Sequence, residues 1–234
     1  YDGGLVLDQE GHVLVPYSAI CMPFPVTVRA QVSNQANGGL EQLYYDHPTV
    51  VGVHPQYNLA LVKIGLPRWA LQPAAISRKP PANRDKLVAV LLPDKPGIGL
   101  EVQDAAHTED GLRFVLAKCS APFQRDGAPV YDSEGKAVGI AFDPLDSPDD
   151  TVAIVPLAGI NPADFIAPEK KQGNPQRAAK LKARGLEWQE KAKKAEASAK
   201  QPASFRAYQY FRRQAAEQPR DPQPCENAGL CLKE

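Results

Sequence analysis

The chain has 234 residues, of which 43% are hydrophobic and 23% charged, and these fractions are typical of a folded globular protein. No run of about 18 apolar residues occurs, which excludes a membrane-spanning helix at the level of sequence. The start "YDGGLV" has neither the basic flank nor the apolar stretch of a signal peptide, so we expect a processed or partial product.

The net charge is zero, but the charges are unevenly distributed along the chain. Residues 1–168 carry 12 Lys and Arg against 19 Asp and Glu, a balance of −7, whereas residues 169–201 carry 10 against 4, a balance of +6. We therefore expect the basic extension either to fold back on the acidic body or to meet an acidic partner. Nucleic acid is not expected as that partner, because the basic segment alternates Lys with Ala and has no interleaved aromatic residues.

Residues 3–156 contain about eleven short runs rich in Val, Leu and Ile, separated by Gly, Pro, Asn and Asp. Turn sequences such as "DQEGH" and "DSEGK" connect them like hairpins, and no helical pattern of three turns interrupts them. This pattern predicts an all-β sandwich or barrel.

The pattern changes to helical after about residue 167. Small or apolar residues recur at intervals of three and four and predict one stripe of a helix: Ala178, Leu181, Gly185, Trp188, Ala192, Ala195 and Ala199. Pro202 is expected to open a second helix, whose stripe comprises Phe205, Tyr208, Phe211 and Ala215. The sequence thus predicts a helical hairpin at 174–218, similar to a single tetratricopeptide-type hairpin, and an extended Pro-rich tail at 219–234.

One helical hairpin cannot bury both of its faces, so we expect it to dock on the barrel or on another protein. Its large side chains are therefore the candidate interaction residues. These are Leu181, Trp188, Phe205, Tyr208 and Phe211.

The four cysteines allow three pairings and show no CxxC spacing, so neither a zinc site nor any cofactor is expected. Cys225 and Cys231 bracket "ENAGL" in a short polar tail, where a local disulfide stabilises most. We predict the pairs Cys225–Cys231 and Cys21–Cys119, and with them an oxidising compartment. Four reduced thiols are the alternative.

Four segments resemble landmarks of the HtrA-type branch of the trypsin-fold serine proteases. "GGLVLDQEGHVLVPYSAI" resembles the two strands that lead to the catalytic His, and "HPQYNLALVKI" is similar to the segment in which an Asp opens the strand "DLALLKI". "DGAPVYDSEGKAVGIAF" is similar to "SGGPLVNxxGxVVGI", and "TVAIVPLAGI" to the later "GFAIP" strand. The resemblance implies a trypsin-like double β-barrel over residues 1–167.

The same resemblance places different residues at the three catalytic positions. Ser18 stands where the family has His, Asn58 where it has Asp, and Asp126 where it has the nucleophilic Ser. The reaction needs a hydroxyl, an imidazole that takes its proton and a carboxylate that orients the imidazole, and here none of the three is present. A carboxylate at Asp126 would also repel the oxyanion, and Ala128 replaces a Gly of the nucleophile turn. We therefore predict that the chain is not an enzyme.

The sequence also offers candidates for a relocated catalytic site and for a metal site. A relocated hydrolase would use His54 with Ser120 or Ser133, and a reactive Cys119 would need a nearby His that the sequence does not locate. The loop 142–150 contains four aspartates, but it lacks the glycine and terminal glutamate of an EF-hand, so a solvated acidic loop is favoured over a Ca²⁺ site. The aspartates are Asp143, Asp146, Asp149 and Asp150.

The favoured function is a pseudoprotease that acts as a structural or interaction subunit of a larger assembly outside the cytoplasm, in a bacterial periplasm or secreted. Its partners would be other protein subunits, bound through the hairpin and tail, with no nucleic acid and no membrane span of its own. The alternative is a module that binds peptides or unfolded chains in the inactive cleft by strand addition. An active serine hydrolase with a relocated site is the third interpretation.

Overall fold

The computed structural model describes residues 2–23, 25–33, 40–91, 96–123, 125–145, 150–195 and 197–231. The chain forms two compact units. The β-unit comprises Tyr1–Pro16 and Pro25–Pro168, and the helical unit comprises Tyr17–Phe24 and Glu169–Glu234. The chain therefore leaves the β-unit after Pro16, returns at Pro25 and leaves it again after Pro168.

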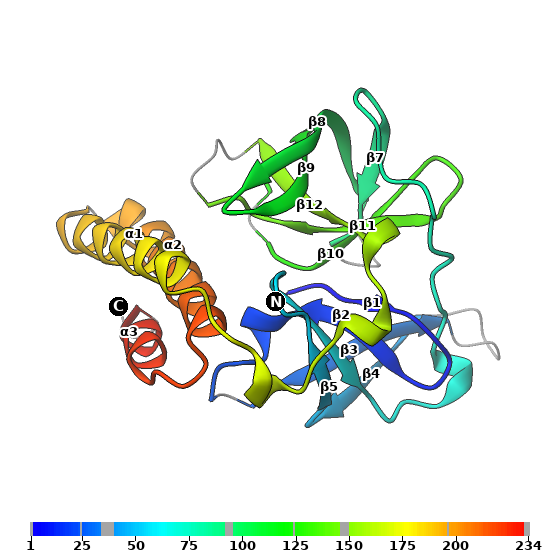
Figure 1. The fold of residues 1–234 in the computed structure, drawn as a ribbon, viewed down its shortest axis with the longest axis horizontal. Helices are drawn as coiled ribbons and strands as arrows, with labels where there is room; N and C mark the ends of the chain where they lie inside the picture. The colour runs from blue at the N-terminus through cyan, green and yellow to red at the C-terminus, as the bar shows by residue number, and fades with distance from the viewer. Residues whose placement is uncertain are drawn as a thin grey trace. The chain divides into compact units, whose positions relative to one another are not determined.

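A closed six-stranded antiparallel barrel forms the second half of the β-unit (Figure 1). Its strands follow the order β10-β11-β12-β9-β8-β7. They are β7 (Lys86–Ala89), β8 (Ile98–Glu109), β9 (Leu112–Cys119), β10 (Ala128–Tyr131), β11 (Ala137–Phe142) and β12 (Thr151–Pro156).

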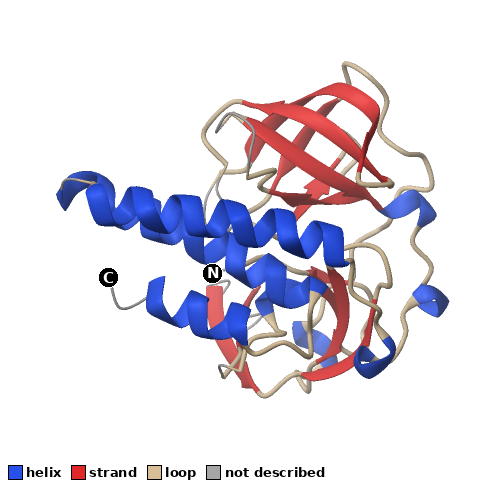
Figure 2. Cartoon of the chain, turned by 60° about the vertical axis from the view of Figure 1, so that its left-hand side comes forward, coloured by secondary structure: helices blue, strands red, loops and turns tan. Residues whose placement is uncertain are grey.

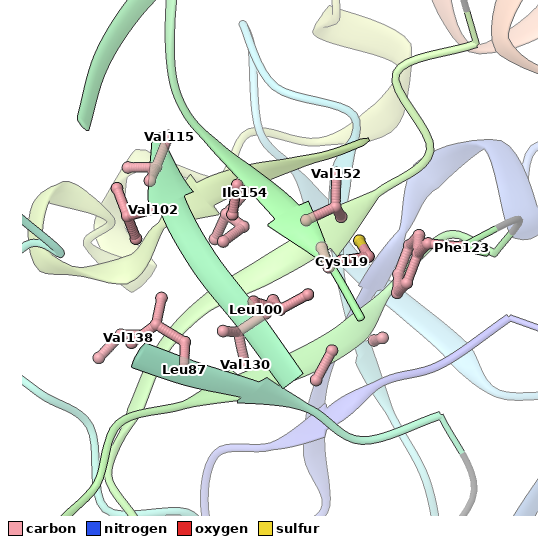
Figure 3. Packing of buried hydrophobic residues seen from close by; sticks show 14 residues of the cluster. Leu87, Leu100, Val102, Val115, Cys119, Phe123, Val130, Val138, Val152 and Ile154 are labelled. Carbon is pink, nitrogen blue, oxygen red and sulfur yellow. The ribbon is translucent and has the colours of Figure 1, made fainter. Parts of the chain in front are cut away.

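The alternation of residues along these strands explains which side chains fill the barrel. In β9 the buried positions include Val115, Ala117 and Cys119, which follow the two-residue period of a strand with one face inward. All six residues of β11 are buried, which fits its run of small and apolar side chains. Figure 3 shows this core, where Leu100, Val130 and Ile154 from different strands converge.

The first half of the β-unit is an open sheet, so the expected second barrel is not closed within the described residues. Four strands follow the order β1-β2-β6-β5, and a two-stranded hairpin of β3 and β4 stands apart from them. The strands are β1 (Leu5–Val6), β2 (His12–Pro16), β3 (Thr27–Ser33), β4 (Leu40–Asp46), β5 (Thr49–Val53) and β6 (Leu59–Lys63). Among 27–30 and 41–46 the side chains of the hairpin are half-buried or exposed.

The open sheet and the barrel share one core within the β-unit. Leu14 and Leu59 of the sheet pack in one cluster with Ile140 and Phe142 of the barrel. Each fully buried leucine side chain contributes about 2 kcal/mol of hydrophobic free energy. This shared cluster fixes the sheet to the barrel.

Three helices build most of the helical unit, α1 (Pro175–Lys194), α2 (Ala197–Glu217) and α3 (Gln223–Cys231), as Figure 2 shows. Asn174 caps α1 by accepting a hydrogen bond from the N–H of Arg177 at 3.0 Å. The stripe of small residues predicted for α1 is its buried face, since Ala178, Gly185 and Ala192 are buried. A Cβ at Gly185 would lie 2.6 Å from the Phe211 ring. The small residue therefore lets α1 approach α2 closely.

Two expectations for this region need correction. Pro202 lies inside α2 and does not open it, because the helix begins at Ala197 and Pro202 falls in its second turn. The tail 219–234 is not extended throughout, since it contains α3. The buried face of α3 comprises Pro224, Ala228 and Cys231, and packing of this face on α2 accounts for the helix in so short a segment.

The core of the helical unit includes a segment from the beginning of the chain. Met22 packs in one cluster with Phe211 of α2 and Ala228 of α3. A 3-10 turn, η1 (Tyr17–Ala19), starts this segment directly after β2. None of the helices that the structure describes is both long enough and apolar enough to cross a membrane.

Candidate functional site

Asp126 lies at the turn before β10, where the resemblance expects a nucleophilic serine. Its side chain is 4% exposed, and its Oδ1 accepts a hydrogen bond from the N–H of Asp143 at 3.1 Å. Asp143 follows β11 and is buried as well, and its Oδ1 accepts from the N–H of Leu145 at 2.9 Å. The carboxylate of Asp126 therefore holds the turn to the loop that leaves β11.

The backbone of this turn is engaged on both sides. The Gly127 N–H donates to the Ala141 carbonyl at 2.8 Å, and the Gly3 N–H donates to the Asp126 carbonyl at 2.9 Å. Gly127 has φ = 83°, and a Cβ there would overlap the Gly3 carbonyl oxygen and lie 2.6 Å from Pro16 Cδ. Only glycine fits this position.

Ala128 does not strain the turn as its Cβ was expected to. It pairs with Ala141 as the first residue of β10 and is not among the described residues with positive φ. The left-handed conformation falls on Gly127 alone.

His54 shapes the turn that carries Asn58. The His54 ring is buried, and its Nδ1 accepts hydrogen bonds from the N–H groups of Gln56 at 3.2 Å and Tyr57 at 3.1 Å. It also packs edge-on against Phe165 at 5.6 Å between ring centroids. A nitrogen that accepts two backbone hydrogen bonds is already occupied, so this geometry does not favour His54 as the base of a relocated hydrolase. Asn58 is half-buried directly before β6.

The two serines considered with His54 also have ordinary positions. Ser120 Oγ accepts a hydrogen bond from the Gly99 N–H at 3.1 Å, which supports the end of the barrel sheet. Ser133 lies exposed in the turn between β10 and β11. Neither position indicates an activated hydroxyl.

Ser18 belongs to the helical unit, whereas Asn58 and Asp126 belong to the β-unit. Ser18 is fully buried in η1, and its carbonyl oxygen accepts a hydrogen bond from Arg212 Nε of α2 at 3.1 Å. Arg212 is itself 8% exposed, and its guanidinium carbon lies 5.4 Å from the centre of the Tyr208 ring. A buried cation of α2 thus fixes the backbone of Ser18, where the resemblance expects an imidazole.

Tyr17 makes a second contact within the helical unit, with Lys171, which lies before α1. Lys171 Nζ lies 5.2 Å from the centre of the Tyr17 ring. Burial lowers the pKa of Lys171, while the Glu217 carboxylate acts in the opposite direction. Burial raises the pKa of Tyr17 to about 12. Burial therefore favours the neutral form of both groups, and the Glu217 carboxylate offsets part of this effect at Lys171.

The structure contains neither of the predicted disulfides, Cys21–Cys119 and Cys225–Cys231, and all four cysteines are reduced in it. Cys225 and Cys231 lie on one helix, where six residues turn the side chains about 120° apart and separate them by about 9 Å along the axis. Cys21 belongs to the helical unit and Cys119 to the β-unit. Burial, followed by the charges of Asp150 and Asp143, raises the pKa of Cys119 to about 11, so this thiol is not activated.

The acidic loop is only partly described, since Asp146 and Asp149 lie outside the described residues. Asp143 accepts a hydrogen bond within its own loop, and Asp150 pairs with Lys118 at 3.5 Å. Across the part of the chain that the structure describes, no group of three or more His, Cys, Asp or Glu side chains could hold a metal ion.

The candidate interaction residues of the hairpin divide into exposed and buried ones. Phe211 is fully buried in the core of the helical unit and is not available at the surface, because it packs against Gly185. Leu181, Trp188 and Tyr208 are half-buried, and Phe205 is 44% exposed.

Sequence reasoning missed two exposed apolar side chains, Leu186 of α1 and Leu230 of α3, which lie off the stripes that it followed. It also missed Arg212. The signal that could have identified it is its position, as a charged residue directly after Phe211 on an otherwise buried stretch of α2.

No family model and no curated protein sequence matches the chain. Solved structures do match. The MamO protease domain from Magnetospirillum magneticum in its apo form is 18% identical, with 66% of this chain and 82% of that chain covered and a TM-score of 0.47. Rv3671c from M. tuberculosis, in an inactive mutant form, is 13% identical, with 65% and 73% covered and a TM-score of 0.45. Deg5 is 19% identical, with 66% and 77% covered and a TM-score of 0.51.

Identities this low show the fold alone, and the Deg5 superposition carries that conclusion. It agrees with the closed barrel and with the order of the segments that suggested the fold. The chain has a trypsin-like fold, which it shares with Deg5.

Proposed function

We propose that this chain is a non-catalytic trypsin-like pseudoprotease that acts as a structural or interaction subunit of a protein assembly outside the cytoplasm. The observation that carries the proposal is the buried carboxylate of Asp126, whose Oδ1 is hydrogen-bonded to the backbone of Asp143 at the turn expected to hold the nucleophile. A side chain with this structural role is neither exposed to a substrate nor able to form an acyl-enzyme.

Chemical reasoning on the other two positions supports the same proposal. Acyl transfer needs a base within hydrogen-bond reach of a hydroxyl, and neither Ser18 nor Asn58 is basic. The nearest candidate base in the sequence, His54, uses its Nδ1 as an acceptor for two backbone amides. A negative charge at Asp126 would also oppose the charge that develops on the substrate oxygen.

The interaction role is supported by the surface of the helical unit. Each of its three helices exposes one large apolar side chain, with exposed fractions of 42% for Leu186, 44% for Phe205 and 51% for Leu230. The last turn of α1 adds Lys191, Lys193 and Lys194. A mixed apolar and basic surface is suited to a protein partner with an acidic rim around an apolar patch.

Activity-based labelling tests the catalytic half of the proposal. The purified full chain, treated with a fluorophosphonate probe, is expected to remain unlabelled and to leave an unfolded substrate such as casein intact. The variant Asp126→Ser should also remain unlabelled, because it restores a hydroxyl without a base. Labelling of the unmodified chain at Ser120 or Ser133 would support the relocated hydrolase and overturn the proposal.

Co-purification from the native source tests the interaction half. We expect a partner in fixed stoichiometry that is lost when Leu186 and Phe205 are both replaced by Glu. Ile76→Glu is the matched control, because Ile76 is 44% exposed but belongs to the β-unit. Saturable binding of extended peptides that survives the Leu186 and Phe205 replacements would instead support the peptide-binding alternative.

A further inference from the structure

Four sulfur-bearing side chains gather in the core of the helical unit, and we call them the sulfur cluster: Cys21, Met22, Cys225 and Cys231. Met22 and Cys231 are buried there, and Cys21 and Cys225 pack against them as partly buried neighbours. Three of the four cysteines of the chain thus lie together, although they come from opposite ends of the sequence.

Within the sulfur cluster, the contacts favour Cys225 as the cysteine that lies near Cys21. Cys225 Sγ lies 3.8 Å from Met22 Sδ, and Met22 directly follows Cys21. Cys21 Sγ lies 4.0 Å from the Arg212 carbonyl oxygen, which places it against α2, the helix on which α3 packs. Burial raises the pKa of Cys21 to about 12, and the charge of a Cys225 thiolate acts in the same direction. Cys231 lies about 9 Å further along α3, on a different side of the helix.

We propose that Cys21 and Cys225 form a disulfide when the protein meets a disulfide oxidant, and that this bond ties the segment Tyr17–Phe24 to α3. In the first step the Cys225 thiolate attacks one sulfur of an oxidant such as oxidised glutathione, which releases one glutathione thiolate and leaves a mixed disulfide on Cys225. Cys21 then attacks the Cys225 sulfur and releases the second glutathione. Two protein thiols are oxidised, one glutathione disulfide is reduced to two thiols, and the two protons of the cysteines pass to the departing thiolates.

The order of the steps follows from exposure. Cys225 is partly exposed on α3, so an oxidant can reach it, whereas Cys21 lies deeper and its thiol has a pKa of about 12. The attack of Cys21 is the slow step, because few of its thiols are ionised at neutral pH.

The bond would close a loop of about 200 residues, the kind of closure that restricts the unfolded chain most strongly. We expect the oxidised chain to melt about 10 °C above the same chain kept in dithiothreitol. The effect should appear in the helical unit, which contains both cysteines.

Peptide mapping of the folded full chain, equilibrated with reduced and oxidised glutathione, tests the pairing. Trypsin alone is insufficient, because Cys225 and Cys231 share the peptide 221–233; cleavage after Glu226 separates them. The expected product links the peptide that contains Cys21 to the one that ends at Glu226. Linkage of Cys21 to Cys119 or Cys231, a Cys225–Cys231 bond, or four thiols that remain free would each overturn the proposal.

Four serine variants provide a second readout that does not depend on mapping. Cys119→Ser and Cys231→Ser should keep the rise in melting temperature on oxidation, whereas Cys21→Ser and Cys225→Ser should lose it. Each variant is compared with itself in dithiothreitol, so a general loss of stability cancels. Loss of the rise in Cys119→Ser, or its persistence in Cys225→Ser, would contradict the assignment.

Discussion

The Asp126 turn and the Ser18 segment are both places where the resemblance expects a catalytic residue, but they are held in place differently. At the turn, the new side chain itself has a role, because the Asp126 carboxylate accepts the Asp143 N–H. In the segment, the contact from α2 is made to the backbone, because Arg212 binds the carbonyl oxygen of Ser18. The turn is therefore held by a hydrogen bond within the β-unit. The segment is held by Arg212 of α2, which comes 194 residues later in the chain.

This difference implies that the two positions should respond to different mutations. The two tryptophans make the responses separable, since Trp69 lies in the β-unit and Trp188 in the helical unit. Replacing one tryptophan by Phe leaves the fluorescence of the other as a reporter for a single unit.

The largest effect is expected from Gly127→Ala. A Cβ there would overlap the Gly3 carbonyl oxygen in a left-handed backbone, so the β-unit should lose about 4 kcal/mol of unfolding free energy. Gly135→Ala is the matched control, because Gly135 has φ = 73° but open space around it, and it should cost only about 1 kcal/mol. Urea unfolding followed by Trp69 fluorescence gives both values. Equal costs would mean that the close approach to Gly3 is unimportant.

Arg212→Met should have the next largest effect, and it should act on the helical unit. The variant removes a charged donor from the buried Ser18 carbonyl, which we expect to cost about 3 kcal/mol in urea unfolding followed by Trp188. Arg184→Met removes an exposed ion pair with Glu187 and should cost less than about 1 kcal/mol. If the two variants unfold alike, the helices do not hold the segment through this contact.

Asp126→Ala should cost about 2 kcal/mol in the β-unit, because the buried Asp143 N–H loses its acceptor. Asp126→Asn retains an acceptor oxygen of the same shape and should stay within about 0.5 kcal/mol of the original chain. Denaturant midpoints of the two variants, read from Trp69, decide whether hydrogen bonding or negative charge is the relevant property. A larger loss in the Asn variant would favour charge.

Alkaline pH should lower the unfolding free energy of each unit by a smaller amount than these substitutions do, and the amount should differ between the units. Burial raises the pKa of Cys21 from 9.0 to about 12, so between these values the folded state keeps a proton that the unfolded state has lost. Stability therefore falls as the pH rises through this range, by at most about 1.4 kcal/mol per pH unit for each such group. Tyr17, with a pKa of about 12, adds to this slope above pH 10.

Cys21→Ala, measured in dithiothreitol, should make the unfolding free energy of the helical unit fall less steeply as the pH rises. The pH dependence of the β-unit should stay unchanged. Cys119→Ala should do the reverse, because Cys119 has a pKa of about 11 and lies in the barrel. Denaturant unfolding at pH 8, 9 and 10 with the two tryptophan reporters measures both slopes. Slopes that Cys21→Ala does not alter would show that this thiol is not buried as described.

Much of the fold could be predicted from the sequence because it is encoded locally. Alternating apolar residues and Gly- or Asp-containing turns specify strands such as β9 and β11, and the small-residue stripe around Gly185 specifies the buried face of α1. The place of Asp126 at the turn before β10 could be predicted because the strand that follows keeps its apolar pattern.

The remaining features depend on contacts between residues far apart in the chain. Nothing near Cys21 indicates that Cys225 is its neighbour, and nothing near Ser18 indicates Arg212. The role of His54 as an acceptor also depends on the exact turn geometry at Gln56 and Tyr57. Strand propensity likewise predicts β3 and β4, but it does not indicate that among the described residues they pair with each other apart from the four-stranded sheet.

The passage of the chain through the helical unit, first at Tyr17–Phe24 and finally at Glu169–Glu234, has a consequence for its biosynthesis. During translation the early segment leaves the ribosome long before the helices that enclose it, while all strands of the β-unit emerge in between. The segment must therefore wait, with Met22 and Cys21 uncovered, until α3 has been made. A holding chaperone or an early oxidant would meet these side chains in the nascent chain, before the native core covers them.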